Sequence, residues 1–471
     1  MRKICRREFI RQFVIASGAL TFPIESAFPS QDKRILIIGA GLSGLYAAQL
    51  LLRYGYSVKV IEARQRVGGR VWTLDEVLGH PEGGANLIGP NYGRIFDVAR
   101  RLGVDLRVPL ETMPADYSID GVRMSDSEWS EWGSNPLPAW MRNITPDRIA
   151  RELLRDNPLK STSDWRRPEL SSHDLSATAF FRSKGLNDKT LSLMEINNSY
   201  GNSLESTSLL SLYRVHKNID RAISMRQPVQ EASKGNSRLA EGMEGLLKEP
   251  VVLGERVAEV RSEKGLIKAR CYSGTEFEGD AAIMALPVGA LREVRFSPAL
   301  GDRQQTAFNQ ITYHKITQAH LLASDCFWDR NTQLASCWTN GALGRVFARP
   351  IPDTSSFNIT VWINGDSCDV FDKYSDTVAA EKIMEHFYEL YPDSAGVVKF
   401  KKLVRWHLDP LSRGAWALWR PGQILKYADL LHNTEDRIFF AGEHTAYASS
   451  GMEGAAESGE RSAMQVMRSL L

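Results

Sequence analysis

Three glycines and one glutamate near the start of the chain have the spacing of a nucleotide-binding turn. Gly39, Gly41 and Gly44 follow four apolar residues, and Glu62 lies 23 residues beyond the first glycine. The first glycine of such a turn allows a sharp bend, the second lets the backbone approach a pyrophosphate, and the third lets a helix pack on a strand. A carboxylate at the position of Glu62 accepts hydrogen bonds from a ribose. These residues predict a dinucleotide site.

The elements needed to hold these residues are recognisable on either side of the turn. Residues 35–38 form an apolar strand, and Leu45, Ala48 and Leu52 have helical spacing. A second strand, residues 57–61, ends at the acid. Because the helix begins at the turn, its unpaired amides and positive dipole end face the phosphates. A chance match in a glycine-rich turn is the alternative, and the strands, helix and acid in register disfavour it.

A second pair of glycines follows the acid. Gly68 and Gly69 stand between Arg66 and Arg70. Glycines flanked by arginines bring backbone amides and positive charge toward phosphate. A surface turn with solvated arginines is the alternative, and the position directly after the ribose acid disfavours it.

This combination resembles the flavin amine oxidase (monoamine oxidase-like) family, in which a Gly-Gly-Arg motif lies beside the pyrophosphate of FAD. The resemblance continues in residues 82–89, which in the family pass beside the flavin, and in residues 404–416 and 437–452. It covers nearly everything after residue 33. It is specific at four separated motifs in the expected order and loose between them.

The resemblance implies FAD contacts that are spread over the whole chain. Val257 matches a valine whose backbone meets the adenine, and a helix beginning near Met452 directs its N-terminus at the flavin ring. The implied FAD-contacting residues are Gly39, Gly41, Ser43, Gly44, Glu62, Ala63, Arg64, Gly69, Arg70, Gly84, Ala85, Leu87, Val257, Trp406, Gly442, Glu443, Gly451 and Met452.

In this family the flavin performs the chemistry. A hydride passes from the carbon alpha to nitrogen onto flavin N5, and the resulting imine hydrolyses in water. The dipole and free amides of the helix near Met452 stabilise charge that develops on the ring. No Ser-His-Asp, Cys-His or metal set is required, and we interpret His407 and His444 as structural residues.

Two departures from the family pattern concern the walls of the amine site. Ala415 stands where monoamine oxidases carry the cysteine that bonds to the flavin, so we expect noncovalent FAD. Trp416 matches one aromatic wall of the cage that holds the amine, and a packed core tryptophan is the alternative. Gly451 matches the opposite wall, so the pocket should be wider or differently lined there.

Two further departures concern the substrate's charge and the electron acceptor. Leu87 matches the arginine that holds the carboxylate in venom-type L-amino-acid oxidases, which disfavours a free amino acid unless another arginine serves. Gln318 matches the lysine that contacts flavin N5 through water and assists reaction with O2. Lys315, three residues earlier, is the alternative in another register. With glutamine at this position we expect slow reaction with O2 and an alternative electron acceptor.

The motifs predict an α/β protein with a Rossmann-like (GR2-type) FAD-binding domain and a discontinuous α+β substrate-binding domain. The expected segments are 1–30 for a signal or tail, 31–93, 230–295 and 403–471 for the FAD-binding domain, and 94–229 and 296–402 for the substrate-binding domain. Between the motifs we expect helices over 146–154, 176–184, 189–196, 237–244 and 377–388, and strands over 251–260, 267–271, 316–322 and 358–364.

The first residues resemble a twin-arginine export signal. Arg6 and Arg7 precede a moderately apolar run over residues 13–24, which is too short to span a bilayer comfortably. We expect export by the twin-arginine machinery to the periplasm or another extracytoplasmic location, without a stable membrane span. An uncleaved anchor and a disordered basic tail are the alternatives.

The 471-residue chain is too long for one simple core and has the composition of a soluble globular protein. Apolar residues make up 43% and charged residues 24%, and the formal net charge of +2 indicates no nucleic-acid partner. Cys5 lies in the signal, and Cys271, Cys326, Cys337 and Cys368 lack metal-ligand spacing. We interpret those four as buried or idle thiols and expect no metal site.

We therefore expect an exported FAD-dependent enzyme that oxidises the C–N bond of a small-molecule amine to a carbonyl product. The amine is primary or secondary with a bulky or aromatic substituent, and O2 or another acceptor takes the electrons. An L-amino-acid oxidase or desaturase on the same scaffold is one alternative. A flavin-bearing export or assembly factor without turnover is another, which Glu62, Arg70 and Trp416 disfavour.

Overall fold

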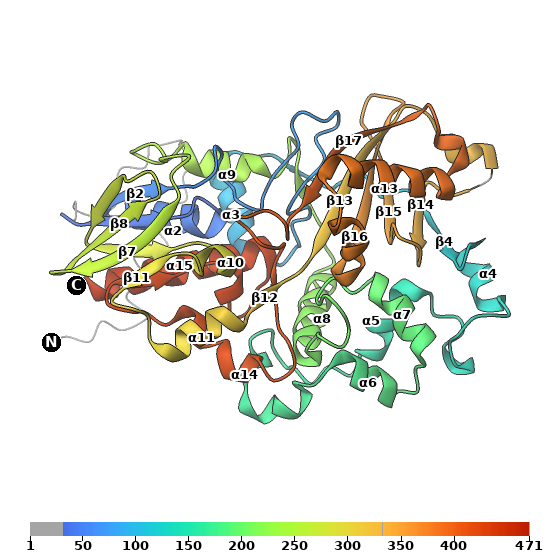
Figure 1. Ribbon diagram of the computed structural model, residues 1–471, viewed down its shortest axis with the longest axis horizontal. Coiled ribbons are helices and arrows are strands. Elements are labelled where there is room, and N and C mark those ends of the chain that lie inside the picture. The colour runs from blue at the N-terminus through green and yellow to red at the C-terminus, as the bar shows by residue number, and fades with distance from the viewer. Residues whose placement is uncertain (1–31, 332, 471) are drawn as a thin grey trace.

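The computed structural model describes residues 32–331 and 333–470. A parallel sheet lies at one end of the long axis and a larger, mostly antiparallel sheet at the other, and the chain crosses between them repeatedly (Figure 1). The predicted twin-arginine segment lies outside the described residues. Within them, no helix combines the length and apolar character that a membrane span requires.

A four-stranded parallel sheet, in the order β19-β10-β1-β2, carries the N-terminal glycine turn. Central β1 (Arg34–Ile38) pairs with β2 (Ser57–Ile61) and β10 (Ala281–Met284), and β19 (Ile438–Phe440) completes the sheet beyond β10. Residues 35–38 are all buried, which explains their continuous apolar run in a sheet covered on both faces. The predicted strand, turn, helix and strand unit is confirmed, with α2 (Leu42–Arg53) as its helix.

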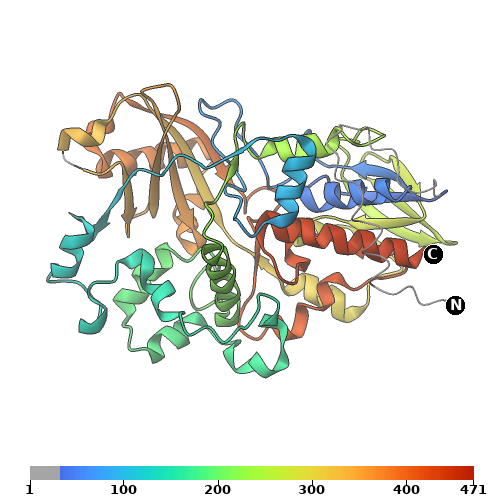
Figure 2. The same cartoon turned by 180° about the vertical axis from the view of Figure 1, so that it is seen from behind.

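Helices cover this parallel sheet and share its core. The C-terminal α15 (Gly451–Ser469) packs along α2, as seen from behind in Figure 2. Two further helices join them: α9 (Ser237–Glu244) packs against α2, and α3 (Gly93–Leu102) packs against α9 and α15. Their apolar residues belong to the same buried cluster. The helix α3 begins at residue 93, where the boundary was expected, and its apolar residues belong to the cluster that covers the parallel sheet. The boundary itself stays a prediction.

A small sheet in the order β11-β7-β8-β9 lies beside the parallel one. The predicted strand over residues 251–260 starts late, because Val252 instead forms a bridge with Ile61 at the edge of the parallel sheet. The chain then turns before β7 begins. The elements are β7 (Val257–Glu263), β8 (Leu266–Cys271), β9 (Glu276–Gly279), α10 (Val288–Leu291) and β11 (Arg295–Ser297).

The larger sheet has seven strands in the order β17-β13-β16-β15-β14-β4-β5. One face packs on α13 and forms a separate apolar core. The strands are β4 (Ala115–Ile119), β5 (Val122–Met124), β13 (Ile316–Ala323), β14 (Ser336–Thr339), β15 (Arg345–Pro350), β16 (Phe357–Asn364) and β17 (Val398–Arg405), and the covering helices are α12 (Asp369–Asp372) and α13 (Asp376–Leu390).

The register of three central strands places particular side chains in one row across the other face of this sheet. Gln318 on β13 is opposite Trp362 on β16, and Trp362 is opposite Arg345 on β15. Directly opposed residues of antiparallel strands point to the same face. The face away from α13 therefore carries Gln318, Trp362 and Arg345 as neighbours.

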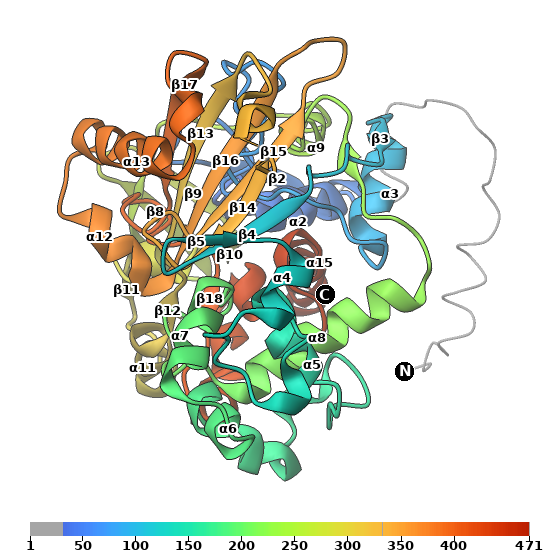
Figure 3. The same ribbon diagram turned by 90° about the vertical axis from the view of Figure 1, so that its right-hand side faces the viewer.

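A group of helices lies below the larger sheet (Figure 3). The segments predicted over 146–154, 176–184 and 189–196 are helical, whereas the longer α8 was not anticipated. The group comprises α4 (Asp126–Glu131), α5 (Ile149–Leu153), α6 (Ala177–Ser183), α7 (Asp188–Ile196) and α8 (Leu209–Ser224). The remaining elements are α11 (Asp302–Gln310), α14 (Ile424–Tyr427) and the strand pairs β3 (Leu106–Arg107) with β6 (Glu231–Ala232) and β12 (Thr312–Tyr313) with β18 (Ala417–Leu418).

Candidate active site

A cavity of about 310 Å³, which we call the nucleotide cavity, lies where the glycine turn, residues 62–70 and the start of α15 meet. All the residues predicted to contact FAD line it except Gly44, and so do Gln318 and Trp416. These residues come from both ends and the middle of the chain. The fold therefore assembles the predicted set around one space, while the role of each residue stays a prediction.

The three glycines of the turn differ in what surrounds them. A side chain at Gly39, whose φ is +105°, would meet the carbonyl oxygen of Ala285 at 2.6 Å, and one at Gly44 would meet the Gly39 carbonyl oxygen at 2.0 Å. A side chain at Gly41 would meet nothing within 4 Å. The first and third glycines are thus required by packing within the protein, whereas the second borders open space that a ligand can approach.

Two helices begin at the nucleotide cavity without a side-chain cap. The N-cap of α2 is Gly41, which has no side chain to accept a hydrogen bond. The N-cap of α15 is Ser450, whose side chain accepts none from its helix. Leu42, Ser43, Gly451 and Met452, in the first turns, line the cavity. Unpaired amides and the positive ends of both helix dipoles therefore face it. This arrangement suits an anionic pyrophosphate at one helix and an electron-rich ring edge at the other.

The carboxylate of Glu62 is held firmly at the cavity wall. One of its oxygens accepts a hydrogen bond from the Ala40 amide and the other from the Arg64 amide, both at 2.8 Å. Each oxygen retains acceptor capacity for a ribose hydroxyl. The Arg64 guanidinium makes two bonds to the Asp409 carboxylate, at 2.8 and 2.9 Å, and one to Ser412. This pairing ties the ribose end of the cavity to the C-terminal motif.

Arg70 connects the second motif to the end of the chain. Its Nη1 donates to the Ala415 carbonyl oxygen at 2.7 Å and to the Glu443 carboxylate at 3.1 Å. The indole N–H of Trp406 donates to the Gly83 carbonyl oxygen at 2.8 Å. These bonds hold the segment that carries Ala415 and Trp416 against the glycine-rich loops. The arginine thus has a visible organising role in addition to the phosphate contact that the resemblance implies.

Gln318 lies on the nucleotide cavity wall, and Lys315 does not. The Gln318 side chain is 1% exposed, and its Oε1 is buried without a partner in the described part of the chain. The Lys315 ammonium instead pairs with Asp369 at 2.7 Å and Asp366 at 3.2 Å, toward solvent. The structure therefore places Gln318, rather than Lys315, at the wall of this cavity, and the match of Gln318 with the family's lysine stays a prediction.

Trp416 lines both this cavity and the larger one beside it, so its ring is not enclosed in a core. Its indole N–H donates to the Ser199 carbonyl oxygen at 2.9 Å. The ring stacks on His314, with centroids 5.1 Å apart. Burial lowers the pKa of His314 to about 3, so that imidazole is neutral at physiological pH. Trp416 is thus a half-buried wall residue whose orientation is fixed on two sides.

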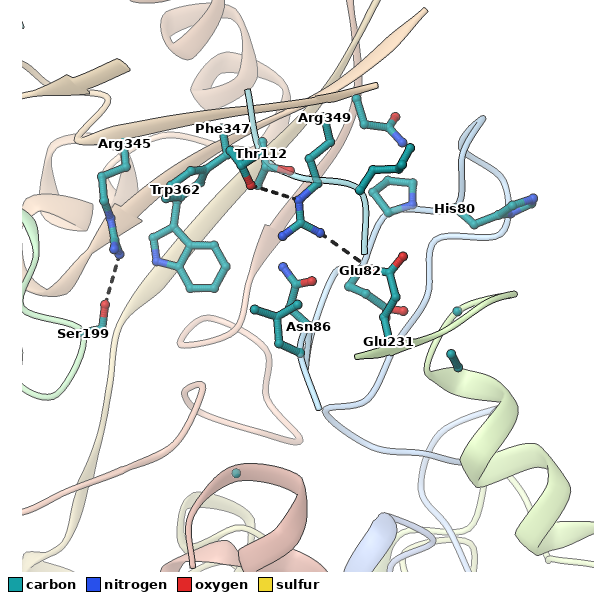
Figure 4. A pocket seen from close by; sticks show the side chains of 18 of the residues that line it. His80, Glu82, Asn86, Thr112, Ser199, Glu231, Arg345, Phe347, Arg349 and Trp362 are labelled. Carbon is teal, nitrogen blue, oxygen red and sulfur yellow. Dashed lines mark hydrogen bonds and ion pairs between the residues drawn. The ribbon is translucent and has the colours of Figure 1, made fainter. Parts of the chain in front are cut away.

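A second cavity, of about 950 Å³, adjoins the first, and we call it the large cavity. Leu87, Trp362, Trp416 and Gly451 line both. Its upper wall is the free face of β15 and β16 (Figure 4). Sequence reasoning missed this wall: it carries Arg345, Phe347, Arg349, Asn358, Thr360 and Trp362. Alternation along each strand was the available signal, but it does not reveal which strands become neighbours.

Other candidate catalytic groups have structural partners. His407 contacts Asp372 at 2.8 Å and the Ile316 carbonyl oxygen at 3.1 Å. His444 contacts Tyr313 at 3.3 Å, and burial, followed by two nearby arginines, lowers its pKa to about 3. Residues 32–331 and 333–470 contain no cluster of three potential metal ligands. The four cysteines in this range are free thiols, and three of them are buried. Their interpretation as buried or idle thiols stays a prediction for their reactivity.

Comparison with known proteins agrees with this geometry. Residues 42–467 match the family model described as flavin containing amine oxidoreductase. An L-amino-acid oxidase from Siganus canaliculatus is 25% identical, covering 93% of this chain and 86% of that protein, and human flavin-containing amine oxidase B is 24% identical over the same shares.

A solved structure shows the same fold. Cyclohexylamine oxidase from Brevibacterium oxydans IH-35A aligns with a TM-score of 0.76 at 19% identity, covering 93% of this chain and 100% of that one. The predicted α/β architecture, with an FAD-binding part and a substrate-binding part, is confirmed.

Proposed function

This chain belongs to the flavin-containing amine oxidoreductase family, and we propose that it oxidises the C–N bond of a bulky or aromatic amine. The family implies FAD, which when bound accepts a hydride from the carbon alpha to nitrogen. One observation carries the proposal. Trp416 and Gln318, matched to the amine cage and to the N5 side of the flavin, both line the nucleotide cavity, and Trp416 also faces the large cavity.

The chain's own residues bind and orient rather than react. The amides at the start of α15 stabilise negative charge at the ring edge. The aromatic rings of Trp416 and Trp362, which line both cavities, offer flat electron-rich walls to the amine. Gly451 adds no side chain at the position matched to the opposite wall, where an added Cβ would lie 3.1 Å from the Tyr92 hydroxyl. The large cavity, of about 950 Å³, has room for a bulky substituent.

We propose that FAD is bound noncovalently. Ala415 lines the nucleotide cavity and offers only a methyl group where the family's flavin-bonding cysteine would lie. None of the residues described as lining that cavity is a cysteine. Noncovalent contacts hold the cofactor instead. They come from the free amides at the two uncapped helix ends, from Glu62, and from the backbone at Gly41, which a ligand can approach.

We propose a slow reaction with O2 and another electron acceptor. A positive charge next to the flavin stabilises the negative charge that O2 acquires when it is reduced. The side-chain amide of Gln318 supplies no such charge. Gln318 occupies the wall position, while the nearby Lys315 charge is neutralised by two aspartates away from the cavity.

We also propose export by the twin-arginine route to an extracytoplasmic compartment. Support comes from the sequence alone: Arg6 and Arg7 ahead of a short apolar run. This route carries folded proteins, which suits an enzyme that loads its cofactor before export.

Anaerobic mixing tests the central proposal. FAD-loaded protein is mixed without O2 with a panel of primary and secondary amines, L-amino acids and saturated acids, and flavin absorbance is followed. Bleaching by bulky amines, with the matching aldehyde or ketone as product, is the expected result. An intact flavin absorbance with every amine would contradict the proposal and favour the non-catalytic flavoprotein. Bleaching confined to L-amino acids or saturated acids would favour the alternative oxidase or desaturase.

A further inference from the structure

Arg345 brings a positive charge to the wall of the large cavity without an acidic partner. Its guanidinium donates to the Asn197 side-chain oxygen at 3.1 Å and to the Ser199 hydroxyl at 3.0 Å, and both acceptors are neutral. Its Nε is buried and has no hydrogen-bond partner among the described residues. Burying a guanidinium without a counter-ion costs desolvation free energy. A bound anion at this position would therefore be stabilised by the charge of Arg345.

The other arginines that line the large cavity lie near carboxylates, whereas Arg345 does not. Arg107 and Arg349 share the carboxylate of Glu231, at 3.0 and 3.7 Å. Arg214, whose Nε is also buried without a hydrogen-bond partner among the described residues, donates to the Ser449 carbonyl oxygen at 2.6 Å and lies near the carboxylates of Glu443 and Glu457. Figure 4 shows Arg349 directed toward Glu231, with Arg345 at the opposite end of the same strand. Among the described arginines that line the large cavity, Arg345 is therefore the one without a nearby carboxylate, and we take it as the anion-binding group.

The acidic residues that line the large cavity do not cancel this charge. Glu231 is engaged by two arginines, and Glu443 pairs with Arg70 at 3.1 Å. Burial raises the pKa of Glu82 to about 8, so this carboxyl is mostly protonated at neutral pH. Arg345 itself stays charged, since burial lowers its pKa only to about 10. The cavity is thus net positive when empty of ligand.

The Arg345 guanidinium is also held in one orientation. It is fixed by Asn197 and Ser199 on one side, and the rings of Phe347 and Trp362 lie 5.7 and 5.8 Å from it. A guanidinium whose planar fork is positioned in advance binds a carboxylate with less loss of entropy. The aromatic rings beside it form an apolar passage for the rest of a ligand.

The sheet register sets how far this charge lies from the reacting end. Gln318, Trp362 and Arg345 occupy one row on three consecutive strands. Neighbouring strands are about 4.8 Å apart, so the backbones of Gln318 and Arg345 are roughly 10 Å apart. An α-amino acid carries its carboxylate on the reacting carbon itself. An anion held by Arg345 must instead be several bonds away from the carbon that is oxidised.

We propose that the substrate is an amine with a carboxylate at the end remote from its nitrogen, and that Arg345 binds that carboxylate. The inference rests on the proposed amine oxidation and specifies its substrate class: an apolar or aromatic spacer with an amine at one end and an anion at the other. It also accounts for Leu87, because no arginine is needed beside the flavin when the carboxylate lies farther along the large cavity.

Arg345 has one competing role, that of a brace. It holds Ser199, whose carbonyl oxygen in turn holds the Trp416 indole. If Arg345 acts only through this chain of contacts, its removal affects charged and uncharged amines equally. A specificity role affects only the amines that carry the anion.

Matched substrate pairs separate the two roles. Hexylamine is compared with 6-aminohexanoate, and 2-phenylethylamine with 4-(2-aminoethyl)benzoate, on the FAD-loaded enzyme. We expect wild-type kcat/KM to favour the carboxylated member of each pair. Arg345→Met should lower that preference by about 10- to 100-fold, the worth of a charge-assisted hydrogen bond, and Arg345→Lys should restore part of it. As a control, Arg182→Met removes an exposed charge from α6 and should leave kcat/KM unchanged for both members of each pair.

Binding without turnover supplies an independent readout. Hexanoate and 4-ethylbenzoate, which have no amine to oxidise, should perturb the flavin absorbance and bind wild type at least about tenfold more tightly than Arg345→Met. Equal losses for both members of a substrate pair, or a wild type that does not prefer the carboxylated member, would overturn the proposal. Failure of amine oxidation itself would appear differently, as an unbleached flavin with every amine while hexanoate still binds.

Discussion

The indole of Trp416 forms part of the wall of both cavities, with its N–H fixed on the Ser199 carbonyl oxygen and one face on His314. Trp416→Ala should therefore lower kcat/KM for amines by about 10- to 100-fold, since an aromatic wall of this kind contributes about 1–3 kcal/mol. FAD should remain bound, because Trp416 is not among the residues predicted to contact it. Steady-state kinetics and the ratio of flavin to protein absorbance measure the two effects.

A tryptophan remote from the cavities provides the control for that variant. Trp140 is 66% exposed, so Trp140→Ala should leave the kinetics and flavin content unchanged. Unchanged kinetics for Trp416→Ala as well would remove Trp416 from the site.

Gln318 and Lys315 form a matched pair for testing the electron acceptor. Reduced wild type should reoxidise slowly in air, and Gln318→Lys should speed reoxidation by about 10- to 100-fold by placing charge at the cavity wall. Lys315→Gln should not alter the rate, because that ammonium pairs with Asp366 and Asp369 away from the cavity. Stopped-flow mixing of photoreduced enzyme with aerated buffer measures the rate. Fast reoxidation of the wild type would refute the acceptor proposal.

At the scale of residues, the sequence could predict which residues come to the cavities where its signal was local, while their roles stay predictions. Gly39 to Glu62 form one contiguous unit, and Trp416 lies in a short motif. The types and spacing of these residues were therefore enough to predict that they contribute to the site. Arg345 and Trp362 offered no such signal. Each occupies an ordinary strand position, and they face one cavity only because β15 pairs with β16 in a particular register.

The start of α2 offers a contrast between two glycines three residues apart. Gly41→Ala adds a methyl group toward open space, so the fold should persist while FAD binding weakens by about tenfold or more. Gly44→Ala places a methyl 2.0 Å from the Gly39 carbonyl oxygen and should destabilise the protein by about 1–3 kcal/mol. FAD titration by fluorescence quenching and urea unfolding of the cofactor-free protein distinguish the two effects.

Either glycine variant can contradict this assignment. A Gly41→Ala protein that binds FAD normally would show that no group of the cofactor approaches this backbone. A Gly44→Ala protein with wild-type stability would show that α2 moves away from β1 without cost.

At the scale of elements, periodic segments were predicted well. The helix expected over 377–388 is α13, and the strands expected over 316–322 and 358–364 are β13 and β16, within two residues at each end. The helix α8 was missed although Ser208 caps it and its first six residues are buried. Its polar second half obscured that pattern. The strand predicted from residue 251 begins only at Val257, because Val252 pairs with Ile61 at the edge of the parallel sheet. This pairing is a tertiary contact that the local sequence does not reveal.

For the whole molecule, the export proposal gives a direct expectation. Replacing Arg6 and Arg7 together with lysine keeps the charge but removes the twin-arginine signature, so the FAD-loaded enzyme should accumulate in the cytoplasm. Cell fractionation with a flavin assay on each fraction measures the distribution. Arg11→Lys, outside the pair, is the control and should still be exported. Normal export of the double variant would contradict the twin-arginine route.

The architecture was predictable at this scale, but the large cavity was not. Four motifs in a fixed order indicated the α/β fold, which the solved relative confirms. The large cavity depends on how β15, β16, α8 and residues 78–87 come together, and no single stretch of sequence encodes that meeting. The exact domain boundaries stay a prediction.

The parallel sheet has a consequence for how the protein is made. Its four strands come from residues 34–38, 57–61, 281–284 and 438–440, and the helix that closes the nucleotide cavity follows the last strand. A nascent chain that has exposed only the first two strands lacks β10, β19 and α15. The wall of the nucleotide cavity is therefore incomplete until the chain has been made beyond residue 451, and a chain that stops short of that residue lacks part of the wall.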